Sequence, residues 1–528
     1  MAYRSRLKIA VALIAFTLGA CSRPVIPSDQ VVIVQEREPL SLNPALDRGA
    51  EQTQWGMLLF NYLVKFDDRG RLIADVATGV PTRANGGISR DGKTITYHLR
   101  RGVRFADGTP LTARDCVYSI EAIQNPANNV PTRYGYDRIV RAVAPNDTTL
   151  VLHLREPFAP LFTVVLAPQG FPILPAHLLA SHPNFNHLPF NEQPLGGGPY
   201  VVRHWYRGDR IELDANPRYF RGRPRIAHLT IRFVPDPNTA ITQLRTREAD
   251  VFFNDFDLGT VSQLQRISGT TVLLTPVNAV GALIFNTRDA TLRDATVRRA
   301  LVQAIDIPSV VAKTYHGAVR AAGAGGGLFQ WAYDPRFPLN TRYDPARAKA
   351  ILAHRHLHVQ LAITTTLPGD SVLGNEIAQD ERAAGVDLQL RAYPISYLIA
   401  PATLGGPVYG GRFQVVYWQF SNGDDPDVAG LFGCAYVAPH GYNISRFCDP
   451  QLDRLLEFAR STYDRAQRTR AYVSVQRVLT QRLPMALLYR RRMIDAYDAR
   501  VGGISGSVSS IFWDVGSWYV KPARSPVH

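Results

Sequence analysis

The sequence predicts a mixed α/β protein built from two lobes. Its 528 residues are 46% hydrophobic and 20% charged, the ordinary balance of a globular protein. A single hydrophobic core stops growing at about 250–300 residues, so a chain of this length is expected to divide. Helical and strand patterns alternate along the chain without one long array of β-α-β units, which favours two α/β lobes over a barrel.

The N-terminus predicts an export signal. A basic stretch precedes an apolar run at residues 9–18, which is shorter than the ~20 residues of a membrane span. The run ends in the sequence LGAC, which resembles the bacterial lipobox, where the chain is cut before a cysteine that receives lipid. We expect residues 1–20 to be a lipoprotein signal peptide, Cys21 to be lipidated and residues 21–29 to be a tether. An ordinary signal peptide ending at Cys21 is the alternative.

The charge of the chain does not indicate nucleic-acid binding. The net charge is +15, and such a basic balance can mark proteins that bind nucleic acids or anionic membranes. Here the arginines are scattered, and the densest run, at residues 490–492, holds only three. Zinc-finger spacing and RNA-binding aromatic motifs are both missing from the sequence, so we expect general surface charge and no nucleic-acid partner.

Three cysteines remain beyond Cys21. Cys434 and Cys448 enclose a 13-residue loop with turn-forming residues, and export would allow them to form a disulfide. Such a bridge would stabilise the fold by about 3 kcal/mol in the loop-entropy model. Cys116 falls early in an expected helix and is predicted to be a buried free thiol. No CxxC or CxH spacing occurs, so no metal site is expected.

Strands and helices alternate through the first half of the chain. Thr112 is a suitable N-cap for the helix that follows it. The three glycines at 196–198 lack the flanking pattern of a phosphate-binding loop and predict a tight structural turn. Strands are expected at residues 31–35, 93–100, 149–154, 200–203, 210–214, 229–234 and 250–253, and helices at 55–63, 112–121 and 238–245.

The second half continues the pattern. Asp294 and Asp344 each precede a helical pattern and are predicted to be N-caps, and a further helix is predicted to start at Asp464. Residues 321–327, which are all glycine or alanine, predict a flexible loop. Strands are expected at residues 283–287, 359–364 and 413–420, and helices at 294–305, 344–352, 452–459 and from 464 to before Pro484.

An ordered set of motifs carries a family resemblance. The motifs are LNP at 42–44, the stretch SRDGKTITYHLRRGVRFADGTPLTARDCVYSI at 89–120, PLGGGPY at 194–200, NPRYFRGRP at 216–224, FNT at 285–287, RDATVRRALVQAID at 293–306 and WQFSNGDDPD at 418–427. Together they resemble family 5 of the bacterial extracellular solute-binding proteins, the dipeptide and oligopeptide receptors of ABC importers. No single motif is specific, but the ordered set spans most of the chain.

The resemblance implies a two-lobed periplasmic-binding-protein type II fold with a hinge and an inter-lobe ligand cleft. Lobe 1 would span residues 30–284, with an inserted subdomain at about 77–190, and would be completed by residues 491–528. Lobe 2 would span residues 285–490. The implied function is to capture a peptide or other small solute as the lobes close, and to deliver it to an ABC permease and its ATPase. A monomer is expected in the periplasm or on the outer face of the cell envelope.

The resemblance also implies a binding site, with one departure. In dipeptide receptors of this family an Asp after the strand's Trp pairs with the α-ammonium of the peptide. Counting from Trp418, that position is Ser421, which cannot neutralise an ammonium. Either Asp424 or Asp425 takes the role by a shift of one residue, or the ligand lacks a free amine, or these carboxylates only build the turn. The expected ligand-binding residues are Trp418, Ser421, Asn422, Gly423, Asp424, Asp425 and Glu38. The same likeness implies the Cys434–Cys448 disulfide.

An enzyme and a non-peptide receptor are the rival interpretations. The sequence lacks the GxSxG, HExxH and Walker motifs, so we expect no catalytic residue and no cofactor. His354, His356 and His358 would share one face of an extended segment and could bind a metal or haem, although a solvated loop is the simpler interpretation. A receptor for haem, a nickel complex, a sugar or another small solute, and a cleft hydrolase, remain alternatives.

Overall fold

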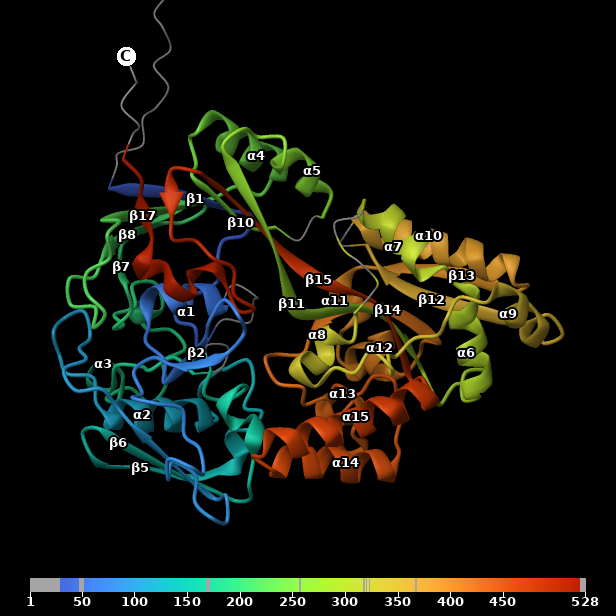
Figure 1. Ribbon diagram of the computed structural model, residues 1–528, viewed down its shortest axis with the longest axis horizontal. Helices are drawn as coiled ribbons and strands as arrows, with labels where there is room; N and C mark the ends of the chain where they lie inside the picture. Colours follow the sequence, from blue (N-terminus) through green and yellow to red (C-terminus); the bar gives the residue numbers. More distant parts are fainter. Residues whose placement is uncertain are drawn as a thin grey trace, which may run out of the picture.

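The computed structural model describes residues 29–46, 52–167, 171–255, 258–316, 319, 321, 323–365 and 368–522. Two bodies lie side by side and are joined by long strands (Figure 1). The predicted signal peptide, Cys21 and the tether up to residue 28 fall outside the described residues. No helix within the described ranges is long and apolar enough to span a membrane.

One ten-stranded sheet runs through both bodies, in the order β13-β12-β14-β11-β15-β10-β1-β9-β8-β7. The long strands β11 and β15 pair antiparallel along most of their length and cross between the bodies (Figure 1). The ten strands are β1 (Gln30–Gln35), β7 (Tyr200–Tyr206), β8 (Arg210–Ala215), β9 (His228–Phe233), β10 (Val251–Asp255), β11 (Thr270–Phe285), β12 (His358–Thr364), β13 (Asp387–Tyr393), β14 (Val415–Ser421) and β15 (Met485–Asp498).

The first body, here called the N-lobe, has a core drawn from residues 31–253 and 501–518. A three-stranded sheet, β4-β6-β5, is covered by α2. The remaining strands near this lobe are β2 (Val64–Phe66), β3 (Leu72–Ala74), β4 (Thr94–His98), β5 (Ile139–Asn146), β6 (Thr149–Leu154), β16 (Val501–Gly502) and β17 (Tyr519–Val520). Its helices are α1 (Gln52–Leu59), α2 (Ala113–Gln124), α3 (Ala176–Leu179), α4 (Pro237–Thr246) and α5 (Val261–Leu264).

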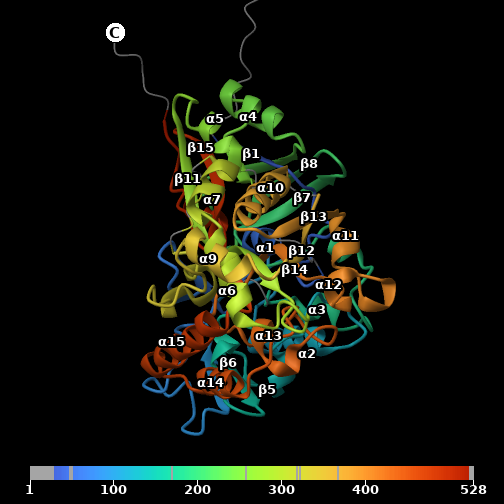
Figure 2. The ribbon, with the colours of Figure 1, turned by 90° about the vertical axis from the view of Figure 1, so that its right-hand side faces the viewer.

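The second body, the C-lobe, has a core drawn from residues 280–487. Its helices are α6 (Ala295–Ala304), α7 (Ile307–Tyr315), α8 (Gly326–Phe329), α9 (Pro345–Leu352), α10 (Pro368–Ala383), α11 (Ile395–Leu398), α12 (Pro407–Gly410), α13 (Ala429–Phe432), α14 (Pro450–Ser461) and α15 (Arg465–Arg482). The helices α14 and α15 lie side by side at the edge of the C-lobe that faces the N-lobe (Figures 1 and 2), and α14 contacts the short helical turn Ala159–Phe162 of the N-lobe.

The two faces of the large sheet carry different cores, because alternate residues of a strand point to opposite faces. On β1, Val31 and Ile33 belong to the N-lobe core, whereas Val32 and Val34 belong to a core on the opposite face. That opposite core continues across both bodies and is covered by helices that include α4, α6, α7 and α10. On one face of the sheet the two lobes therefore share a hydrophobic core, and on the other face each lobe has its own.

The N-cap residues in the sequence correctly predicted where several helices begin. Thr112 caps α2 in a capping box with Asp115, and Asp294 and Asp344 cap α6 and α9 as predicted. The helix expected from Asp464 is α15, and Asp464 is its N-cap. Cys116 is buried and unbonded, also as predicted. The lobe boundaries at residues 284 and 490 remain predictions.

The glycine-rich turn at residues 195–200 is structural. Gly196 and Gly198 pack against the backbone of Leu59, so close that a Cβ on Gly196 would stand 1.9 Å from the Leu59 carbonyl oxygen. The Gly198 amide also donates a hydrogen bond of 3.0 Å to that oxygen. Only glycine fits this contact, which explains the motif without a bound phosphate.

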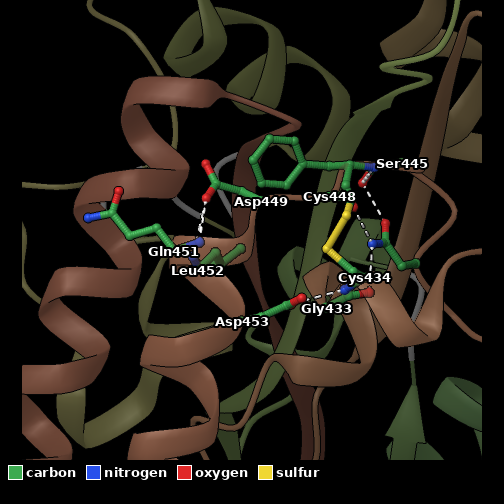
Figure 3. Close-up of a disulfide and its surroundings, with 10 residues drawn as sticks. Gly433, Cys434, Ser445, Cys448, Asp449, Gln451, Leu452 and Asp453 are labelled. Atoms are coloured by element: carbon green, nitrogen blue, oxygen red, sulfur yellow. Dashed lines mark hydrogen bonds between the residues drawn. A yellow bond between two sulfur atoms is a disulfide. The ribbon is translucent and has the colours of Figure 1, made fainter.

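The predicted disulfide is present. Cys434 and Cys448 are bonded and join the segment after α13 to the start of α14 (Figure 3). The Asp453 carboxylate accepts a hydrogen bond from the Cys434 amide, and Asp449 caps α14 through the amides of Gln451 and Leu452. The bridge therefore anchors the loop that follows the candidate site to a well-capped helix.

Candidate functional site

A cavity of about 530 Å³ is lined by residues of both lobes. This volume falls within the roughly 300–1,000 Å³ typical of small-molecule sites. The N-lobe supplies Ala45, Ile123, Val130, Pro131, Thr132, Tyr134, Tyr136 and Val164. The C-lobe supplies Ile284, Ile399, Val408, Tyr409, Trp418, Phe420, Ser421, Asn422, Gly423, Asp427, Gly430, Leu431, Tyr442, Ile444, Ser445 and Met485.

Four of the predicted binding residues line this cavity: Trp418, Ser421, Asn422 and Gly423. They lie at the end of β14, whose Trp418 and Ser421 pair with β11 opposite Ala282 and Ala279. Because β14 pairs with β11 in the large sheet, its last residues are held in place in the wall of the cavity. Ser421 is exposed, and the Asn422 side-chain amide donates to the carbonyls of Leu328 and Asp425.

Asp424 is not among the lining residues. It is buried and accepts hydrogen bonds from the Asn278 side-chain amide at 2.8 Å and from the Ser509 hydroxyl at 3.4 Å. Asn278 is held in turn by Arg490 at 3.1 Å, so this carboxylate faces the crossing strands. Burial raises the pKa of Asp424 to about 7, and these two hydrogen bonds offset part of the rise.

Asp425 also points away from the cavity. Its side chain is fully buried, with one oxygen 2.7 Å from Nη2 of Arg468 on α15 and the other accepting a 2.8 Å hydrogen bond from the Thr163 hydroxyl. Thr163 belongs to the N-lobe, so this carboxylate bridges the two lobes. A buried charge is tolerated when it is paired and hydrogen-bonded, and both conditions hold here.

Asp427 does line the cavity and was not singled out from the sequence. Its Oδ2 accepts a 2.6 Å hydrogen bond from the Tyr134 hydroxyl and lies 3.3 Å from Nε of Arg460, an ion pair without hydrogen-bond geometry. Its Oδ1 accepts the Ala429 amide at 3.1 Å. The signal that could have found it was the third acidic residue of the DDPD run.

The lobes meet around these two carboxylates. Arg460 of α14 lies over the ring of Phe158 at 5.3 Å, and Tyr463 accepts a hydrogen bond from the Phe158 amide while donating one to the Gly92 carbonyl. Phe158 and Gly92 belong to the N-lobe. In this structure the cavity is therefore closed at one edge by direct contacts between the lobes.

Glu38 lies elsewhere in the N-lobe. Its carboxylate accepts hydrogen bonds from the Trp205 indole at 2.9 Å and the Gly208 amide at 3.1 Å, and it is not a lining residue. The histidine cluster is likewise apart: His358 lies at the start of β12 and bonds Asp387 at 2.8 Å. Within the described part of the chain, no group of three or more His, Cys, Asp or Glu side chains could hold a metal ion.

The aromatic character of the cavity was underestimated from the sequence. Besides Trp418, its wall includes Phe420 and four tyrosines, Tyr134, Tyr136, Tyr409 and Tyr442. They come from segments far apart in the chain, and only the folded structure brings them together. Such rings offer large apolar surfaces for a ligand.

Comparisons with known proteins agree with this architecture. The chain is 27% identical to Protein XP55 of Streptomyces lividans, over 90% of this chain and 87% of that protein. It is also 27% identical to the dipeptide-binding protein of Escherichia coli, over 94% of this chain and 95% of that protein. The ABC transporter substrate-binding protein CtaP of Listeria monocytogenes has the same fold, with a TM-score of 0.80 at 21% identity, over 93% of this chain and 99% of that one.

The family model described as bacterial extracellular solute-binding proteins, family 5, matches residues 73–437, which is more than half of the chain. The two-lobed fold and the cavity between the lobes fit that match. The chain belongs to family 5 of the bacterial extracellular solute-binding proteins.

Proposed function

We propose that this protein is the substrate-binding component of an ABC importer and that it captures peptides in the cavity between its lobes. The observation that carries the proposal is the position of the cavity, whose wall is built from both lobes. A ligand held there touches both lobes at once, so its binding energy favours the closed arrangement. The similar proteins named above include a dipeptide-binding protein and an ABC transporter component.

The closed arrangement is the form that a permease would recognise. Closure brings Thr163 and Tyr134 of the N-lobe onto Asp425 and Asp427 of the C-lobe. A ligand in the cavity that packs against its aromatic wall adds apolar contacts with both lobes. We further propose anchoring to the membrane through a lipidated Cys21, export to the periplasm or outer face of the envelope, and action as a monomer.

The experiment is a thermal-shift and calorimetric screen of the purified chain against pooled dipeptides and tripeptides. Gly430 lines the cavity and an added Cβ there meets no atom within 4 Å, so Gly430→Phe should fill the cavity without straining the backbone. Gly79 has the same open surroundings on an exposed surface and gives the matched control, Gly79→Phe.

Peptides should stabilise the wild type and Gly79→Phe but not Gly430→Phe. No stabilisation by any peptide, or equal stabilisation of all three proteins, would contradict the proposal. A non-peptide receptor is the second candidate, favoured by the largely apolar lining. Stabilisation only by haem, a nickel–histidine complex or a sugar in the same screen would support it.

A further inference from the structure

We propose that the cavity selects ligands whose enclosed part is uncharged. A peptide with neutral, blocked ends would then bind in preference to the same peptide in its zwitterionic form. This inference rests on the proposed function and specifies the class of substrate. The inference is based on the partners of Asp424, Asp425 and Asp427, the three carboxylates that follow β14.

Asp427 is the one Asp, Glu, Lys, Arg or His among the lining residues that the structure describes. Its side chain is only 2% exposed. Both of its oxygens are engaged, Oδ1 by the Ala429 amide and Oδ2 by Tyr134 and Arg460. An α-ammonium from a ligand would have to compete with the Arg460 guanidinium for a carboxylate that is already neutralised.

The two preceding carboxylates are also unavailable. Asp425 is 0% exposed and is paired with Arg468. Asp424 is 4% exposed and faces Asn278 and Ser509 at the crossing strands. Neither lines the cavity: Asp425 joins the two lobes, and Asp424 faces the crossing strands β11 and β15.

The exposed polar group at the end of β14 is the Ser421 hydroxyl, which is uncharged. Among the described lining residues, the other polar side chains carry hydroxyls and amides, such as those of Thr132, Asn422 and Ser445. These groups match the peptide bonds of a ligand but cannot compensate a desolvated ammonium or carboxylate. The affinity for a free-ended peptide should therefore fall by at least about tenfold relative to the same peptide with blocked ends.

The test is a competition read by native mass spectrometry. A pool of dipeptides and tripeptides of Ala, Val, Leu and Phe is divided, and one half is N-acetylated and C-amidated. The chain is incubated with an equimolar mixture of both halves. Enrichment of the blocked peptides by at least about tenfold is expected. Equal binding, or enrichment of free-ended peptides, would overturn the inference and leave the peptide function standing. Retention of neither half would overturn both.

A pair of variants tests the same point within the protein. Ser421→Asp introduces a carboxylate at the exposed end of β14, and Ser421→Asn is its uncharged match. We expect the preference for free N-termini to be about tenfold higher in Ser421→Asp than in Ser421→Asn. Because Ser421 is exposed, both variants should unfold at the temperature of the wild type. The same preference in both variants would contradict a role for the missing charge.

Discussion

The Tyr134 hydroxyl donates a 2.6 Å hydrogen bond to Oδ2 of Asp427, and this bond joins the N-lobe to the C-lobe on the wall of the cavity itself. It can form only when the two lobes are close together. Asp427 is held from its own lobe by Arg460, so the acceptor is fixed and the N-lobe supplies the donor. The bond therefore links closure of the lobes to the shape of the ligand site.

Tyr134→Phe should weaken ligand binding by about tenfold or more, because a hydrogen bond to a charged group contributes about 1.5–3 kcal/mol and is available only in the closed form. Calorimetry with a bound peptide and small-angle scattering of the lobe separation would measure this. Tyr136→Phe is the control, since the Tyr136 hydroxyl donates to Val165 within the N-lobe. Equal lobe separation in the wild type and Tyr134→Phe would contradict the role.

Asp425→Ala should lower the free energy of unfolding by about 3–5 kcal/mol, because it leaves the Arg468 guanidinium buried without its partner. Replacing both residues, as Asp425→Leu with Arg468→Met, should recover much of that loss, since a well-packed apolar pair avoids the desolvation of two charges. Urea unfolding of Asp425→Leu, of Arg468→Met and of the double variant gives the coupling energy. Additive effects would show that the pair does not act as a unit.

Stability should fall with rising pH because of Asp424. Burial raises its pKa in the folded protein to about 7 from an ordinary value of 3.8, so the folded state binds the proton more tightly than the unfolded chain. Its favourable contribution is complete below pH 3.8 and is lost as the pH rises through about 7. Relative to Asp424→Asn, the wild type should lose up to about 1.4 kcal/mol per pH unit across that window. Parallel unfolding curves for the two proteins from pH 4 to 8 would rule this out.

Removing the Cys434–Cys448 bridge should lower the free energy of unfolding by about 3 kcal/mol. The reason is that the unfolded chain regains the freedom of the closed loop. Urea unfolding of a Cys434→Ala, Cys448→Ala double variant measures the loss. The wild type treated with a reductant should then match the variant, whereas the reductant should leave the variant unchanged.

Cys21→Ser should release the protein from the membrane fraction of an expressing cell, because the thiol that would carry the lipid is lost. Cell fractionation followed by immunoblotting measures the distribution. Cys116→Ser removes a buried thiol and should leave the membrane association as in the wild type. Retention of Cys21→Ser in the membrane fraction would contradict lipid anchoring.

The family, the fold and the helix caps could be predicted from the sequence because they depend on local spacing and ordered motifs. The strand β15 was missed because its run of three arginines, at residues 490–492, suggested surface charge. In the fold Arg490 is half-buried across β11, where it donates to the Val277 carbonyl. The strand β11 was predicted only at its last residues, since its first part has no regular alternation.

The candidate site was predicted only along β14. Trp418 and Ser421 were found because one continuous motif contains them, but the directions of Asp424 and Asp425 depend on partners far away in the chain. Thr163 is 262 residues from Asp425, and Ser509 is 85 residues from Asp424. No local pattern carries such long-range pairing, so the choice between a binding carboxylate and a structural one required the fold.

The route of the chain through the two lobes has a consequence for how the protein is made. The N-lobe core combines residues 31–253 with residues 501–518, where Phe512 packs against Phe253 at 4.6 Å. A ribosome delivers residues 280–487 of the C-lobe before that last segment. The lobe that is begun first is thus completed last. A nascent chain that ends before residue 501 holds all the residues of the C-lobe core beside an N-lobe core that still lacks residues 501–518.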